Sequence, residues 1–220
     1  HHVGKTNGVA FGWGIYATTN REDAERFGDN VYEQTFFTNR APGDESYLIE
    51  WDKEVSPENQ NRILDGLVNT ARHNDNLKKK IEDAIREEED ELGVDRNSDD
   101  YNPPDVSGMP DDILRDAVEK TVNIAYANGS EVYRELARVL SRKNVDSFDE
   151  RTDAYRMASE FLRDECDIDG IKYPASMDES QEKNASHYVS FRDDNIRVDN
   201  TWTDGEQRYS IRSEEPPKKT

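Results

Sequence analysis

The spacing of the apolar residues changes twice along the chain, and this change most constrains the fold. Residues 31–37 (VYEQTFF) and 47–51 (YLIEW) are short runs rich in β-branched and aromatic residues, which is typical of strands. From Ser56 the apolar residues recur at helical spacing, and near residue 168 strand-like runs return. The sequence therefore predicts an α+β protein, with strands from both ends of the chain and a helical insertion at about 56–165.

Cap residues and breaks divide the insertion into helices. Ser56 followed by Pro57 predicts a helix start, with the serine as N-cap and the proline at the first helical position. The pair Asn128-Gly129 predicts a helix end, after which Ser130 can begin the next helix. A further helix is expected over about 149–165. The polar segment 95–110, which carries two adjacent prolines, is expected to be a mobile loop with nothing to bury.

The segments outside the insertion are expected to complete the sheet. Thr19 lies three residues before Glu22, which is the spacing of a capping box and predicts a short helix over 19–27. Beyond Asp199 the charged sequence predicts a tail or linker over 200–220, which leaves residues 1–199 as one domain. After the insertion, strands are expected over residues 168–173, 187–191 and 195–198.

Charge and cysteine content exclude several classes of protein. The 49 acidic and 29 basic residues give a net charge of -20, which repels phosphate backbones and makes direct nucleic-acid binding unlikely. The acidity favours solubility, and a decoy surface that mimics DNA is the alternative. Cys166 is the single cysteine, so an intramolecular disulfide and a multi-cysteine zinc site are excluded, and we expect a buried thiol. No metal site and no membrane span are expected.

The segment 9–18 (VAFGWGIYAT) carries the densest chemical signal. Its glycines Gly12 and Gly14 flank Trp13 and would let the backbone approach a flat ligand, with the ring of Tyr16 free to stack on it. The segment is not the dinucleotide-binding fingerprint, because no third glycine follows at the required spacing. The alternative is a tight turn whose aromatic residues belong to the core.

The order of the motifs resembles a known family. FGWGIYAT, a short helix, VYEQTFF and YLIEWDKEVSPENQ follow one another, and YREL at 133–136, DGIKYP at 169–174 and HYVSF at 187–191 come later. This order resembles the ADP-ribosyltransferase-like domain of the polyvalent proteins of phages and conjugative elements, over about residues 3–198. That family is of the His-Tyr-Glu type and is more distantly similar to the poly(ADP-ribose) polymerases. The resemblance implies a split β-sheet with NAD in a cleft between its halves.

The resemblance also implies roles for individual residues. Tyr16 would stack on nicotinamide, and His187 falls at the late-strand position where the family has a glutamate that stabilises the ribosyl cation. This is a departure, because a neutral imidazole lacks the charge of a carboxylate; a half-exposed strand residue without a role is the alternative. The family's first-strand histidine either lies outside this sequence or is replaced by His1 or His2. The implied NAD-binding residues are Phe11, Gly12, Trp13, Gly14, Tyr16 and His2.

The expected function follows from the resemblance. It is an NAD-dependent mono-ADP-ribosyltransferase that modifies a host protein, with NAD as substrate and no metal. The domain would be part of a larger mobile-element protein and would act in the cytoplasm of a bacterial or phage-infected cell, with delivery into a recipient as one route. The alternatives are a catalytically inactive domain of the same fold that binds NAD or a protein partner, and the acidic decoy.

Overall fold

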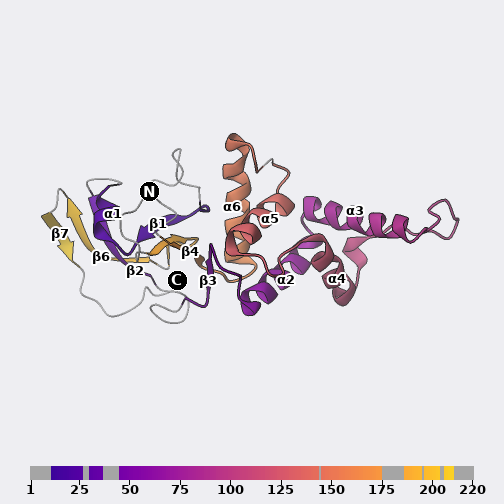
Figure 1. The fold of residues 1–220 in the computed structure, drawn as a ribbon, viewed down its shortest axis with the longest axis horizontal. Coiled ribbons are helices and arrows are strands. Elements are labelled where there is room, and N and C mark those ends of the chain that lie inside the picture. The colour runs from indigo at the N-terminus through magenta and orange to yellow at the C-terminus, as the bar shows by residue number, and fades with distance from the viewer. Residues whose placement is uncertain are drawn as a thin grey trace.

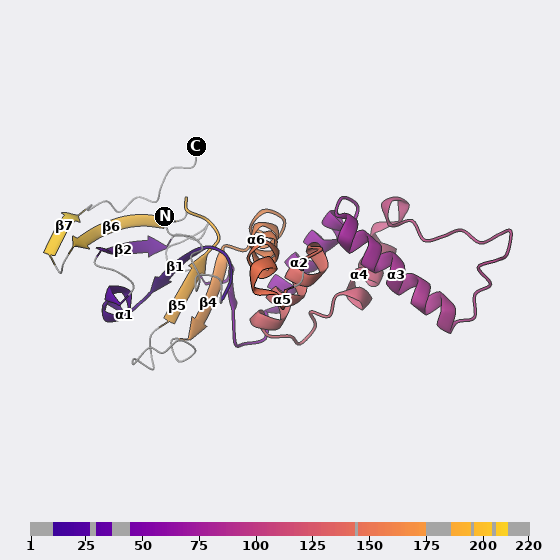
Figure 2. The same ribbon diagram turned by 90° about the horizontal axis from the view of Figure 1, so that it is seen from above.

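Strands and helices occupy opposite ends of an elongated molecule (Figures 1 and 2). The computed structural model describes residues 11–26, 30–36, 45–143, 145–174, 186–194, 196–203 and 206–210. From β1 in the strand-rich end, the described chain passes through the helices and returns to the strands. The expected α+β class is therefore confirmed.

A four-stranded sheet borders the helices. Its strand order is β1 (Ile15–Thr18), β5 (Ser186–Ser190), β4 (Gly170–Pro174) and β3 (Leu48–Glu50). Both β1 and β4 run antiparallel to β5, whereas β3 runs parallel to β4. Parallel neighbours need a crossover connection, and here the whole helical segment is that connection.

A three-stranded antiparallel sheet forms the far end of the molecule (Figure 1). Its central strand is β6 (Ile196–Thr203), which pairs with β2 (Asn30–Phe36) on one side and β7 (Glu206–Ser210) on the other. Residues 200–203 and 206–210, which the sequence places in a tail or linker, are therefore strands. The β-branched and aromatic residues of this stretch favour strand pairing despite the charged residues around them.

The short helix α1 (Arg21–Glu25) joins the two sheets, and it begins one residue later than expected. Asn20 is the N-cap, and its side chain accepts a hydrogen bond of 2.8 Å from the Glu22 amide. Thr19 does not cap the helix, because its hydroxyl accepts a hydrogen bond of 3.0 Å from the Ser186 amide of β5. The guanidinium of Arg21 lies 4.8 Å from the ring centroid of Trp202, so a cation–π contact connects α1 with β6.

The helical segment contains five α-helices and one 3-10 turn. Ser56 caps the first helix by accepting a hydrogen bond of 3.2 Å from the Asn59 amide, as the sequence predicts. The elements are α2 (Pro57–Ala71), α3 (Asp75–Glu91), η1 (Val106–Gly108), α4 (Asp111–Thr121), α5 (Gly129–Leu140) and α6 (Phe148–Asp164).

The expected helix end at Asn128-Gly129 is wrong. α4 already ends at Thr121, and Asn128 is the N-cap of α5. Its side chain accepts a hydrogen bond of 3.0 Å from the Glu131 amide, while the Glu131 carboxylate accepts one of 2.9 Å from the Asn128 amide. A reciprocal capping box of this kind marks the start of a helix. Asn128 therefore caps α5 through its side chain, and the flexibility of Gly129 is not used to end a preceding helix.

The segment 95–110 was expected to have nothing to bury, and this is wrong for Val106, whose side chain is fully buried. The Tyr101 hydroxyl donates a hydrogen bond of 2.8 Å to Glu89, and Lys78 donates one of 2.6 Å to the hydroxyl of Ser107. Both contacts join the segment to α3.

One hydrophobic core joins the helices to the four-stranded sheet. Ile171 and Val189 of the sheet are fully buried in the same cluster as Leu136 of α5 and Leu162 of α6. The helical insertion therefore packs on the sheet and does not form a separate core. Cys166 is buried in this cluster, as predicted from the sequence.

Candidate functional site

The glycine turn that precedes β1 packs against protein atoms. Gly12 has φ of +120°, and a Cβ there would lie 2.9 Å from Cδ1 of Ile171 and 3.3 Å from the ring of Tyr133. A Cβ at Gly14 would clash with the Ser190 carbonyl oxygen of β5. Both glycines are therefore required by the packing of the turn on the sheet and on α5. The sequence had suggested close approach to a ligand as the reason for them.

The hydroxyl of Tyr16 closes this turn. It donates a hydrogen bond of 2.8 Å to the Gly12 carbonyl oxygen and accepts one of 3.2 Å from the Phe11 amide. The half-buried Tyr16 ring meets the ring of Tyr173 edge-on at 6.5 Å between centroids. Tyr16 thus holds the turn in place from β1, and its stacking on nicotinamide stays a prediction.

Aromatic residues line the turn. The ring of Phe11 stacks on Tyr173 at 4.0 Å and 10°, and it contacts Trp51 edge-on at 5.5 Å. The Trp13 amide donates a hydrogen bond of 3.1 Å to the hydroxyl of Tyr133. The alternative interpretation of the segment, a tight turn with core aromatics, therefore describes Phe11 correctly.

Tyr133 fixes the turn from the helical side. Its fully buried hydroxyl donates a hydrogen bond of 2.6 Å to the Tyr155 carbonyl oxygen and lies 2.7 Å from the Ser159 hydroxyl, in addition to its bond from Trp13. Burial raises the pKa of Tyr133 far above its ordinary value, so the hydroxyl remains a donor. The sequence marked Tyr133 only as part of a matching motif, because nothing local shows that α5 reaches the turn.

His187 is buried, whereas the sequence left open a half-exposed strand residue. It lies on β5 with 3% exposure, opposite Thr18 of β1 and Tyr173 of β4. Its ring meets that of Tyr173 edge-on at 5.1 Å and 85°. Its Nε2 lies 3.7 Å from Oδ2 of Asp23 on α1, and Asp23 is also only 3% exposed.

Asp23 is the residue of this site that sequence reasoning missed. A carboxylate in the first turn of a short helix usually faces solvent, where the helix dipole favours it. Here the aspartate points inward, and its Oδ1 lies 3.5 Å from Nη1 of Arg26. Burial is a property of the packed fold, so no local pattern in the sequence separates Asp23 from the neighbouring Glu22.

Tyr16 and His187 lie on the same face of the sheet. Residues paired across neighbouring strands point to one side, and so do alternate residues along one strand. Tyr16 pairs with Val189, which lies two residues after His187 on β5. Tyr173 pairs with His187 and contacts both predicted site residues. Phe11, Tyr16 and His187 thus all contact the ring of Tyr173. Asp23 contacts His187 from α1.

The opposite face of the same sheet carries a second polar group. Glu45 accepts a hydrogen bond of 2.6 Å from Lys172 of β4 and one of 3.0 Å from the hydroxyl of Tyr188 of β5. Burial and the nearby carboxylate raise the pKa of Tyr188. This group lies across the sheet from His187 and is exposed at Glu45, so it is separate from the site.

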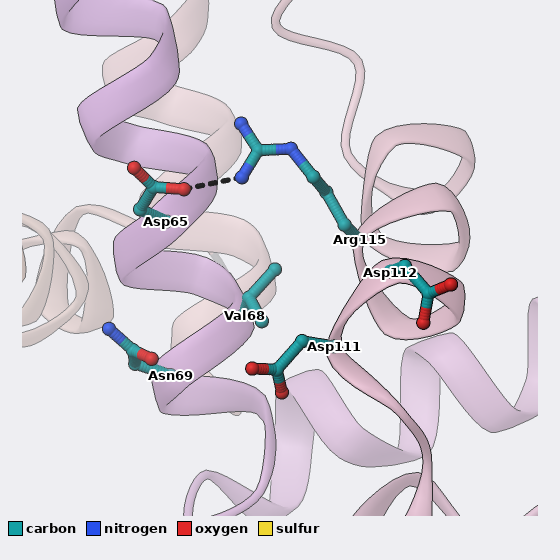
Figure 3. A pocket seen from close by; sticks show the side chains of 6 residues that line it. All are labelled: Asp65, Val68, Asn69, Asp111, Asp112 and Arg115. Carbon is teal, nitrogen blue, oxygen red and sulfur yellow. Dashed lines mark hydrogen bonds and ion pairs between the residues drawn. The ribbon is translucent and has the colours of Figure 1, made fainter.

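A hollow of about 310 Å³ lies in the helical part, between α2 and α4 (Figure 3). Arg115 reaches across it to form an ion pair with Asp65. Its other lining residues are Val68, Asn69, Asp111 and Asp112. The carboxylates of Asp65, Asp111 and Asp112 oppose the entry of a ligand that carries a diphosphate, so this hollow does not suit NAD.

His2 lies outside the described residues. Among the residues that the structure describes, no group of three or more histidine, cysteine or acidic side chains is arranged to hold a metal ion. Within the same part of the chain, no helix is both long and apolar enough to cross a bilayer.

Comparisons with models of known protein families, with curated proteins and with solved structures find no match. A functional assignment must therefore come from the residues of the site and from the motif resemblance.

Proposed function

We propose that the chain is an NAD-dependent mono-ADP-ribosyltransferase domain that modifies a host protein. The observation that carries the proposal is the placement of Tyr16 and His187 on one face of neighbouring strands, where both contact the ring of Tyr173. These two residues come from segments 171 positions apart in the sequence (187 minus 16), each within a motif that resembles the family. The two observed sheets would be the halves of a split sheet.

The chemistry assigned to this site is cleavage of the bond between the nicotinamide nitrogen and its ribose. The partly buried rings of Tyr16 and Phe11, which pack on the buried ring of Tyr173, offer an aromatic surface on which a flat nicotinamide can stack. Positive charge develops on the ribose carbon as nicotinamide leaves, and it needs preorganised negative charge nearby. NAD is a substrate in this scheme, and the protein target is a nucleophilic side chain on another protein.

The wider setting is also part of the proposal. The domain would belong to a larger polyvalent protein of a phage or conjugative element and would act in the cytoplasm of a bacterial or infected cell. The net charge of -20 supports a protein target over a nucleic acid.

Calorimetry with NAD and an assay for released nicotinamide test the proposal. We expect NAD binding by the wild type and a loss of at least about tenfold in affinity for Tyr16→Ala, because a stacked aromatic ring contributes on the order of a kcal/mol or more. Tyr32→Ala is the matched control, since Tyr32 is 55% exposed on β2 of the other sheet. Equal NAD affinity of the wild type and Tyr16→Ala would contradict the role of Tyr16, and absence of NAD binding would contradict the function.

The second candidate function is a catalytically inactive domain of the same fold that binds NAD or a protein. The observation that favours it is the burial of His187 at the position of the family's glutamate. NAD binding without release of nicotinamide in the same two assays would identify this second function.

A further inference from the structure

A carboxylate and an imidazole meet in the interior between α1 and β5. The side chains of Asp23 and His187 are each 4% exposed, and the two nearest atoms, Oδ2 and Nε2, lie 3.7 Å apart. Burying a carboxylate beside an imidazole is costly, and well-packed apolar side chains are often at least as stable as a buried ion pair. A pair of this kind beside a row of aromatic rings is therefore a candidate for function rather than for stability alone.

The two carboxylate oxygens of Asp23 face different partners. Nη1 of Arg26 lies 3.5 Å from Oδ1, but the Arg26 side chain is 47% exposed and is therefore partly screened by solvent. The other oxygen, Oδ2, faces His187. The edge-on contact of His187 with Tyr173 places the pair next to the aromatic surface assigned to nicotinamide.

We infer that Asp23 is the carboxylate of this site and that it acts through His187, an inference that rests on the proposed transferase function. The bond between the ribose carbon and the nicotinamide nitrogen breaks, and its electron pair leaves with nicotinamide. The nucleophilic atom of the acceptor forms the new bond to the ribose carbon, and the proton of the acceptor passes to water. The carboxylate of Asp23 orients the buried imidazole of His187 beside Tyr173 and brings negative charge toward the ribose carbon, where positive charge develops.

Asp23 is a positioning residue in this scheme, because it acts on the reaction through His187. The negative charge that the late strand lacks at position 187 is supplied from α1 instead. The carboxylate of Asp23 therefore contacts the side chain at position 187, where the family resemblance places a glutamate.

Turnover of NAD by Asp23→Asn tests the inference. We expect kcat for nicotinamide release to fall by about a hundredfold, which is typical of losing one preorganised group, with KM changed by less than about threefold. Glu22→Gln is the matched control, because Glu22 is the exposed acidic neighbour on the same helix, and it should behave as the wild type. A carboxylate with only a structural role would lower the unfolding temperature without separating kcat from KM.

A second carboxylate position supplies the rescue. His187→Glu alone brings two carboxylates into buried contact, so it should unfold at a lower temperature than Asp23→Asn/His187→Glu, which holds only one. The double variant should recover most of the kcat that Asp23→Asn loses. If the changes in unfolding temperature of Asp23→Asn and His187→Glu add up to that of the double variant, the two side chains do not interact. This result would overturn the inference.

The outcomes separate the inference from the function on which it rests. Wild-type kcat in Asp23→Asn would overturn the role of Asp23 and leave the transferase function standing. No nicotinamide release by the wild type or by any variant, the double variant included, would overturn both.

Discussion

Removing the hydroxyl of Tyr133 tests how strongly the helical segment holds the glycine turn. Tyr133→Phe keeps the ring and its packing but deletes an oxygen that takes part in three hydrogen bonds, with Trp13, Tyr155 and Ser159. The position is fully buried, so water cannot replace the missing oxygen without entering the core.

The expected loss of stability can be estimated bond by bond. The Tyr155 carbonyl lies within α6 and can keep its helical hydrogen bond, and the Ser159 hydroxyl can turn toward that same carbonyl one helical turn back. The Trp13 amide, which is partly buried in the turn before β1, loses the hydroxyl that accepts its hydrogen bond. A donor left without an acceptor in the interior costs about 1–3 kcal/mol, so we expect Tyr133→Phe to lose about 2 kcal/mol of unfolding free energy.

Urea denaturation measures this loss, and hydrogen exchange of the Trp13 amide locates it. Ser159→Ala is the control, because it removes one bond of the hydroxyl and leaves the Trp13 amide with its acceptor; about 1 kcal/mol of loss and unchanged Trp13 exchange are expected. A change below about 0.5 kcal/mol in Tyr133→Phe, or unchanged exchange at Trp13, would refute the reasoning.

Two further predictions concern the helical segment. Asn128→Ala removes the capping box with Glu131, so it should lower the unfolding free energy measured in urea by about 1 kcal/mol. Asn123→Ala, at an exposed position before α5, should have little effect, and equal losses in the two variants would contradict the cap. Burial raises the pKa of Cys166, so its reaction with a disulfide reagent should stay slow between about pH 7 and pH 9 and become fast only after unfolding. A native rate that reaches the rate of the unfolded chain and levels off by about pH 9 would contradict this.

The elements with a local signal could be predicted from the sequence. Ser56-Pro57 marks the start of α2 because both residues act through their own backbone and side-chain geometry. The strands β2 and β5 were predicted from β-branched and aromatic content, and both are confirmed with boundaries shifted by one residue. In each of these cases the deciding interaction lies within a few residues of the signal.

The features that depend on distant residues could not be predicted. Thr19 fits a helix cap on local grounds, but β5 provides a competing partner that only the folded sheet brings near. Asn128 fits both a helix end and a helix start, and the hydrogen bonds with Glu131 decide between them. For the candidate site, Tyr16 and His187 could be named from the motif, whereas the burial of Asp23 and the reach of Tyr133 required the packed fold.

The parallel pair of β3 and β4 bears on how the protein folds. Leu48 of β3 pairs with Gly170 of β4, so the chain between them must close a loop of about 120 residues before this pairing forms. Such non-local contacts are slow to form, whereas the helices are built from local ones. We expect the helical segment to fold first and to act as the template on which the four-stranded sheet assembles. The glycine turn would then acquire its native shape among the last steps of folding, because it is held by this sheet and by α5 together.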